Sequence, residues 1–177
     1  MRKEEIIKAS RNIFNEFSDA CLQIPDDKFF FQPAEKWSIA QNADHLIRSV
    51  KTTTLAYSLP KIFVRTLFGK PNQSSRTYEE LVAKYKLKLQ QGGKASGRYL
   101  PKTRLPKKFR LIQKWQRENE TYLEALDLKW KDKQFDHYLA PHPLLGKLTL
   151  RELCYFTIYH TEHHLNIIKA RFAEQSN

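Results

Sequence analysis

The chain has 177 residues, of which 41% are hydrophobic and 28% are charged, and its formal net charge is +12 at pH 7. This length suits one domain with its own buried core, and the apolar content excludes a disordered chain. No apolar run approaches the roughly 18 residues of a membrane span, and the charged N-terminus lacks the core of a signal peptide. We therefore expect a single cytoplasmic domain over residues 1–177, with no membrane partner.

The two cysteines, Cys21 and Cys154, lie far apart in the sequence, each in a stretch with helical periodicity. So few cysteines at such a distance favour buried, reduced thiols over a disulfide. A reducing compartment fits this interpretation and agrees with the expected cytoplasmic location.

The first half of the chain predicts two long helices. Apolar residues recur at helical spacing over residues 2–22, and Pro25 follows directly. Ser38 is a suitable N-cap, and Gln41 stands where it completes a capping box. The second helix is expected over residues 39–58.

Shorter elements follow. Residues 61–68 either extend the second helix or form a short one of their own. Thr77 and Glu80 predict a second capping box, which opens a helix over residues 77–89. The basic stretch 98–106 contains two prolines and is expected to be a mobile surface loop.

Two more long helices are expected in the last part of the chain. One covers residues 107–126. Residues 129–138 are predicted to form a packed crossing segment or a short strand. After a turn, Thr149 and Glu152 predict a third capping box, and the final helix then continues to about Glu174.

Four long amphipathic helices with short connecting helices predict an all-α fold, a four-helix bundle. The sequence shows neither an internal repeat nor an alternating strand pattern. In such bundles, metal sites are built in the interior from side chains on facing helices.

Three histidines are the candidate metal ligands. His160 and His164 are one helical turn apart on an apolar, inward face, so one ion can contact both rings. His45, on the second helix, lies on a stripe of small and polar residues that borders the core. Each histidine alone is more simply a hydrogen-bonded imidazole, but together they supply three nitrogens, the ligand number of a catalytic zinc site with an open position.

Other polar residues near this set have lesser expected roles. His163 is interpreted as a neighbour of the ligands, with the role of a last-resort ligand as the alternative. His142, between two prolines, is interpreted as a plain turn residue, although its loop could approach the same end of the bundle. Glu162 points away from the two ligands of its helix, so the general base of an H-E-x-x-H metalloprotease is missing and that class is rejected. Weak candidates for orienting the ligands are Gln41, Thr52 and Tyr57.

Three stretches of the chain resemble the signature segments of the DinB/YfiT-like superfamily. They begin at Trp37 (WSIAQNADHL), His142 (HPLLGKLTLRE) and Tyr159 (YHTEHHL). The resemblance covers the chain from its first helix to its last. It implies a four-helix bundle with a divalent metal ion, whose three histidine ligands fall on His45, His160 and His164.

The resemblance also indicates a class of reaction. The superfamily includes metal-dependent hydrolases and transferases that use a low-molecular-weight thiol such as bacillithiol or mycothiol. We therefore expect an enzyme that activates a thiol or water nucleophile and acts on a small-molecule substrate. Imidazole ligands do not select one metal: zinc or nickel is favoured, and iron or manganese is the alternative.

The basic charge supports a different class of function. Residues 84–114 contain eleven Lys or Arg and no Asp or Glu. Such a segment either solubilises the protein or binds an anion, so a nucleic-acid-binding or polyanion-binding module with a structural or vestigial metal site is the alternative. Whether the chain retains activity, and whether it forms a homodimer, stay open at this level.

Overall fold

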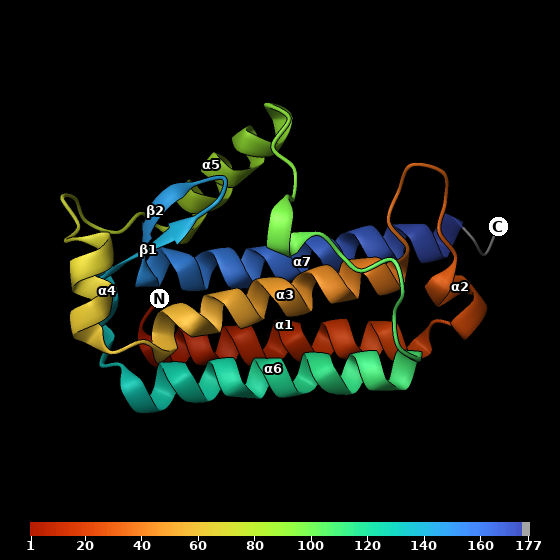
Figure 1. Ribbon diagram of the computed structural model, residues 1–177, viewed down its shortest axis with the longest axis horizontal. Helices are drawn as coiled ribbons and strands as arrows, with labels where there is room; N and C mark the ends of the chain where they lie inside the picture. The colour runs from red at the N-terminus through yellow and green to blue at the C-terminus, as the bar shows by residue number, and fades with distance from the viewer. Residues whose placement is uncertain (175–177) are drawn as a thin grey trace.

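Residues 1–174 of the computed structural model are described, and four long helices run side by side along its length (Figure 1). They are α1 (Lys3–Gln23), α3 (Ile39–Ser58), α6 (Lys108–Lys129) and α7 (Leu150–Glu174). Both α1 and α3 contact α6 and α7, so each long helix packs against two others. The predicted four-helix bundle is confirmed.

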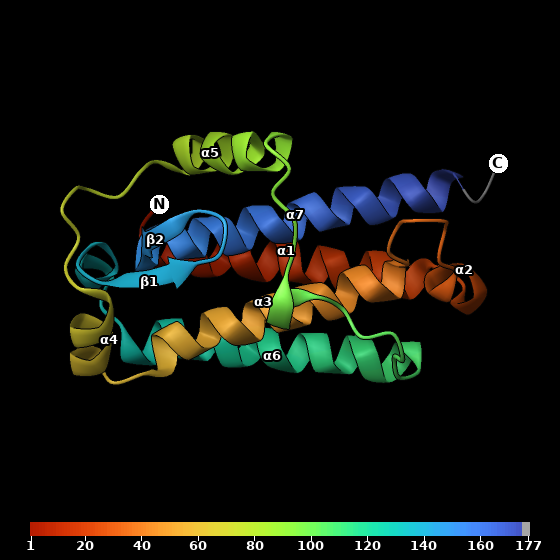
Figure 2. The same cartoon turned by 45° about the horizontal axis from the view of Figure 1, so that its top comes forward.

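Short elements connect these helices. They are α2 (Asp26–Phe30), α4 (Lys61–Phe68), α5 (Tyr78–Gln90), 3₁₀ turns at Gly97–Tyr99 and Asp132–Asp136, and strands β1 (Leu139–His142) and β2 (Gly146–Thr149). Figure 2 shows α5 outside the bundle, beside the first half of α7, while α4 and the strands close one end. The segment at 61–68 is therefore a separate helix.

The two strands correct one sequence-based expectation. Residues 139–149 form an antiparallel hairpin, with His142 opposite Gly146, where the sequence predicted only a turn. The strands are four residues long and β1 contains Pro141, so no alternating pattern is visible. The suggestion of a strand within 129–138 is wrong, because that stretch contains the end of α6 and a 3₁₀ turn.

All three predicted capping boxes are present. Ser38 Oγ accepts a hydrogen bond from the Gln41 amide, and the Gln41 side chain accepts one from the Ser38 amide. The same reciprocal pairs open α5 and α7, at Thr77 with Glu80 and at Thr149 with Glu152. These local bonds fix where α3 and α7 begin, and therefore fix which of their residues face each other.

The core is rich in aromatic side chains. Trp115, Tyr57 and Tyr122 are fully buried, and the indole N–H of Trp115 donates to the Phe14 carbonyl oxygen. The first half of α7 is buried on nearly every side, because α1, α3, α5 and the hairpin all contact that helix. Cys154 lies in this buried half and is a free thiol, as is the buried Cys21, which confirms the expectation of reduced cysteines.

Within the described residues, no helix combines the length and apolar character needed to cross a membrane.

Candidate metal centre

The bundle brings His45, His160 and His164 together in its interior. His45 comes from α3 and the other two from successive turns of α7, and each residue is only 4–6% exposed. The Nε2 atom of His160 lies 3.1 Å from the Nε2 of His45 and 3.1 Å from that of His164. His160 and His164 lie on one face of α7, as their spacing predicted, and His45 faces them from α3.

Two of the rings are held by hydrogen bonds at their other nitrogen. His45 Nδ1 lies 2.7 Å from the carbonyl oxygen of Tyr99, and His164 Nδ1 lies 2.8 Å from Asn42 Oδ1. Both partners are oriented as acceptors, so each Nδ1 is the protonated nitrogen. The Nε2 of each ring is therefore a bare lone pair that points at His160.

This arrangement fits a cation. His160 has a single Nε2 and can supply at most one proton between two lone pairs, so hydrogen bonds alone leave the cluster incompletely satisfied. Three imidazoles bound to one tetrahedral ion at about 2.05 Å would have their nitrogens about 3.3 Å apart. The observed separations of 3.1 Å are close to that value, and the three ligand atoms all lie within 4.8 Å of one another. These three buried histidines could therefore bind a metal ion.

Burial keeps the three rings neutral, which metal binding requires. Desolvation lowers the pKa of His45, against the opposing effects of the Tyr99 carbonyl and Asp44. Desolvation, and after it the charge of neighbouring histidines, lowers the pKa of His160 and of His164 well below the ordinary value. The imidazoles are thus available as ligands at neutral pH without first losing a proton.

A cavity of about 550 Å³ opens beside the three rings. Its wall combines aromatic side chains, among them Trp37, Tyr85 and Phe156, with the cations Lys94 and Arg98. Phe156 stacks on His160 at 4.8 Å between ring centroids, and Trp37 packs on His45 at 5.0 Å. Among the described residues, no Asp or Glu lines this cavity. The open side of the cluster therefore faces a partly apolar chamber large enough for a small molecule.

The other predicted residues divide into two groups. His163, His142 and Thr52 line the cavity, and His142 also accepts hydrogen bonds from the turn amides of Leu144 and Leu145, as expected of a turn residue. Glu162 accepts a hydrogen bond from Tyr78 on α5 and is absent from the cavity wall, in line with the rejection of a metalloprotease. Gln41 completes the capping box of α3. Tyr57 donates to the Leu150 carbonyl oxygen in the core.

The two groups that hold the ligand rings were missed at the sequence level. Asn42 lies on the polar stripe with His45, but its contact is with His164, 122 positions away in the chain. Tyr99 acts through its backbone carbonyl, which no side-chain pattern can indicate. The stretch 98–106 was expected to be a mobile surface loop, but its start is tied to α3: Arg48 donates to the Arg98 carbonyl and the Lys102 amide donates to Asp44.

The basic segment 84–114 is spread over several elements. It begins in α5, crosses α3 through the loop, and ends in α6 at the far end of the bundle (Figure 1). Some of its cations have structural partners: Lys84 donates to the Leu145 carbonyl, and Lys108 donates to that of Ile24 and pairs with Asp26.

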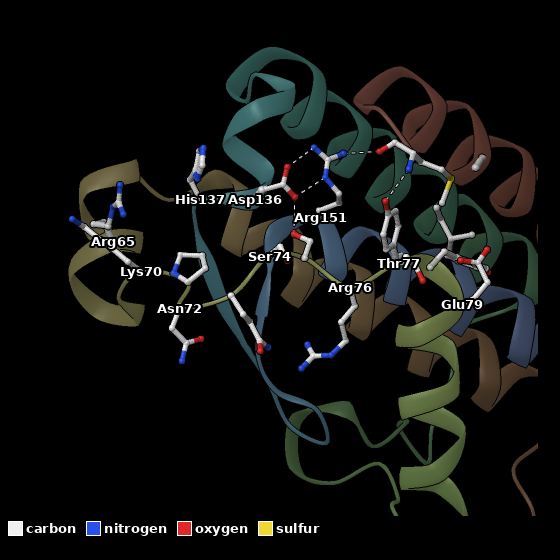
Figure 3. A pocket seen from close by; sticks show the side chains of 18 residues that line it. Arg65, Lys70, Asn72, Ser74, Arg76, Thr77, Glu79, Asp136, His137 and Arg151 are labelled. Atoms are coloured by element: carbon white, nitrogen blue, oxygen red, sulfur yellow. Dashed lines mark hydrogen bonds and ion pairs between the residues drawn. The ribbon is translucent and has the colours of Figure 1, made fainter.

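A larger hollow of about 1240 Å³ lies at the N-terminal end of α7, where Arg151 meets Asp136 (Figure 3). Its central charges already have partners: Arg151 makes a two-bond contact with Asp136 at 2.7 and 2.8 Å, and Arg76 pairs with Glu152 at 2.7 Å. The smaller cavity, where three nitrogens lack a shared partner, is therefore the candidate site.

The fold and the histidine cluster together define a class of protein: a helical bundle with three inward histidines on two facing helices, able to hold a metal ion beside a chamber. A comparison with protein families matches residues 9–168 to the DinB superfamily. The chain belongs to the DinB superfamily, and the resemblance noted in the sequence is confirmed. No curated protein and no solved structure matches the chain in the corresponding comparisons.

Proposed function

We propose that the chain is a metal-dependent enzyme that activates a thiol or water nucleophile at His45, His160 and His164. The observation that supports the proposal is the set of three converging Nε2 atoms, two of them fixed as lone pairs by Tyr99 and Asn42. A purely structural histidine cluster would be expected to satisfy its own hydrogen bonds. Zinc or nickel is the proposed metal, with iron or manganese as the alternative.

A divalent cation held there would favour the deprotonated form of a thiol or of water near neutral pH. The chain's own residues do the rest. The Tyr99 carbonyl and Asn42 fix the orientation of two rings, so their lone pairs are already aimed before a ligand enters. Trp37, Tyr85 and Phe156 form an apolar wall that limits the access of bulk water.

A thiol transferase is favoured over a hydrolase. Hydrolysis normally uses a general base near the attacking water, and no carboxylate among the described residues lines the cavity. A thiol that has already lost its proton needs no such base. Hydrolysis is the second candidate because His163 lines the same cavity, and burial lowers its pKa so that the ring is neutral and able to accept a proton.

The proposed substrate is a small molecule, with a low-molecular-weight thiol as the second reactant. The free, buried thiols Cys21 and Cys154 support a reducing compartment, where such a thiol would be available, and we place the protein in the cytoplasm.

The basic segment 84–114 supports the alternative of polyanion binding, with a metal that is structural or vestigial. That function predicts nucleic-acid binding that weakens steeply with salt and is unchanged in His45→Ala. The spread of these cations over α5, the loop and α6 favours the enzyme instead, because they do not form one continuous stripe along a single element.

Metal analysis of untagged protein tests the proposal. After reconstitution with Zn²⁺ and gel filtration, we expect about one ion per chain in the wild type and less than about 0.2 in His160→Ala. Glu162→Ala is the matched control, since this neighbour on α7 faces Tyr78 instead of the cluster. A wild type that retains less than about 0.2 ion per chain contradicts the metal site.

A second experiment separates the two reactions. In cobalt-substituted protein, a thiol bound at the centre produces thiolate-to-cobalt charge-transfer absorption. We expect this band on titration with 1-propanethiol. Its absence at saturating thiol, with cobalt bound, would favour the hydrolase.

A further inference from the structure

His142 presents a hydrogen-bond donor whose position is set by the hairpin turn. Its Nδ1 accepts hydrogen bonds from the backbone amides of Leu144 and Leu145, at 3.2 and 3.1 Å. Two amide donors directed at one nitrogen exclude a proton there, so the ring proton is on Nε2. The turn thus fixes both the tautomer and the orientation of the ring.

The Nε2–H group of His142 has no acceptor among residues 1–174. The ring is only partly exposed, lies 4.1 Å from the Phe156 ring between centroids, and lines the same cavity as the three clustered histidines. Phe156 in turn stacks on His160. The turn holds this donor in a fixed position at the cavity, where an acceptor on a bound ligand can replace water as its partner.

The charge of the chamber indicates what kind of acceptor this is. Lys94 and Arg98 line the wall, together with five histidine rings, and no Asp or Glu of the described chain does. With a divalent cation on the neutral rings, the chamber has an excess of positive charge. An anionic ligand is therefore favoured over a neutral one.

We propose that His142 donates a hydrogen bond from Nε2 to a carboxylate of the small molecule that occupies the cavity. His142 is then a specificity-determining residue that selects acidic ligands. The inference rests on the proposed function, because the other end of the same molecule is taken to bind at the metal.

Two substitutions separate the role of His142 in the turn from its role as a donor. His142→Asn places Oδ1 near the position of Nδ1, so it keeps the acceptor for the Leu144 and Leu145 amides. Its N–H₂ group stands near the ring carbon Cδ2, so the variant has no donor at the position of Nε2. His142→Gln places an amide N–H₂ near the position of Nε2, so it keeps a donor and removes the acceptor of the turn.

The probes are mercaptoacetate, 3-mercaptopropionate and 4-mercaptobutyrate, compared with 1-propanethiol, which has no carboxylate. Binding to cobalt-substituted full-length protein is followed by charge-transfer absorption and by calorimetry. We expect His142→Asn to weaken the tightest mercaptocarboxylate roughly 10- to 100-fold, as for a hydrogen bond to a charged group, with 1-propanethiol changed less than about twofold. His142→Gln should stay within about threefold of the wild type for every probe.

Equal affinities of the wild type and His142→Asn for all three acids overturn the inference, as does an equal loss for the acids and for 1-propanethiol. A wild type that takes up no cobalt contradicts the proposed function instead. In that case, calorimetric comparison of the same acids on the metal-free wild type and His142→Asn still decides the role of His142.

Discussion

Two polar clusters lie along α7, and they are completed in opposite ways. At the start of the helix, Arg151 contacts Asp136 (Figure 3). It also donates to Asp132 and to the Met1 carbonyl oxygen, so every side of the guanidinium has a partner. Farther along, His160 and its neighbours point lone pairs at one another. The charges of the first cluster are paired within the protein, whereas the nitrogens of the second need a bound ion as their shared partner.

In this protein, the larger of the two hollows is not the candidate functional site. The hollow beside Arg151 has about twice the volume of the chamber beside His160, yet its central charges neutralise each other. We therefore expect changes at Arg151 to affect stability alone, and changes around the histidines to affect metal binding first.

The largest expected effect is stabilisation by metal. Zn²⁺ at a thousandfold above its Kd should stabilise the wild type by about 4 kcal/mol, which raises Tm by about 8 to 16 °C for a chain of this size. His45→Ala should show almost none of this shift, and Arg151→Met should show all of it. Differential scanning fluorimetry with and without Zn²⁺ measures the three proteins. An equal shift in His45→Ala would mean that Zn²⁺ acts elsewhere.

Next in size is the loss of the Arg151 cluster. Arg151→Met keeps the length of the side chain but leaves Asp136 and Asp132 without their shared cation, and we expect a loss of about 3 kcal/mol in the free energy of unfolding. Urea denaturation at pH 7 measures the change. Metal content should stay at the wild-type level, and a loss of metal would show that the two clusters are coupled.

A smaller effect is expected at Asn42. Asn42→Ala removes the acceptor that holds His164 Nδ1–H, so metal affinity should fall about 10- to 100-fold without abolishing binding. Competition with a chromophoric chelator measures this affinity. Asn42→Asp keeps an oxygen acceptor and should bind at least as tightly as the wild type. Equal affinity in Asn42→Ala would show that the ring is held by packing alone.

The smallest effect is the acid dependence of the Arg151 cluster. Burial acts to raise the pKa of Asp136, but hydrogen bonds from Arg151 and Ser75 outweigh it, and the net pKa is lowered. A lowered folded-state pKa gives stability that is present above the unfolded value of about 3.9 and is lost as the pH falls through the folded value.

The stability difference between the wild type and Arg151→Met should therefore be constant from pH 7 to about pH 5 and shrink below about pH 4. Urea denaturation at each pH measures it. Protonation of the buried histidines affects both proteins alike and cancels in the difference. If the difference in the free energy of unfolding grows toward low pH, the assigned role of Asp136 is contradicted.

Much of the fold follows from local signals. Capping boxes fix the starts of α3, α5 and α7 within a few residues of sequence, and apolar periodicity identifies the four long helices. The hairpin could not be predicted in this way. Its strands are short and contain a proline, and the pairing of β1 with β2 depends on the elements packed around them.

In the candidate site, too, local features could be predicted from the sequence and contacts between distant residues could not. His160 and His164 share a face because of their spacing on one helix, which the sequence states directly. The contacts of Asn42 with His164 and of Tyr99 with His45 join positions 122 and 54 residues apart. These contacts depend on the position of α7 along the axis of α3 and on the path of the loop. No short sequence pattern indicates either of them.

The hydrogen bond from His45 to a backbone carbonyl has a consequence for evolution. Any amino acid at position 99 can provide that oxygen, provided that the chain keeps its path through the short 3₁₀ turn at Gly97–Tyr99. The residues at positions 94, 95, 96, 98 and 99 also form part of the cavity wall. Apart from Gly97, whose positive φ of 54° favours glycine, the side chains of this segment can therefore diverge and change what the chamber accepts, while the ring that the segment anchors stays in place.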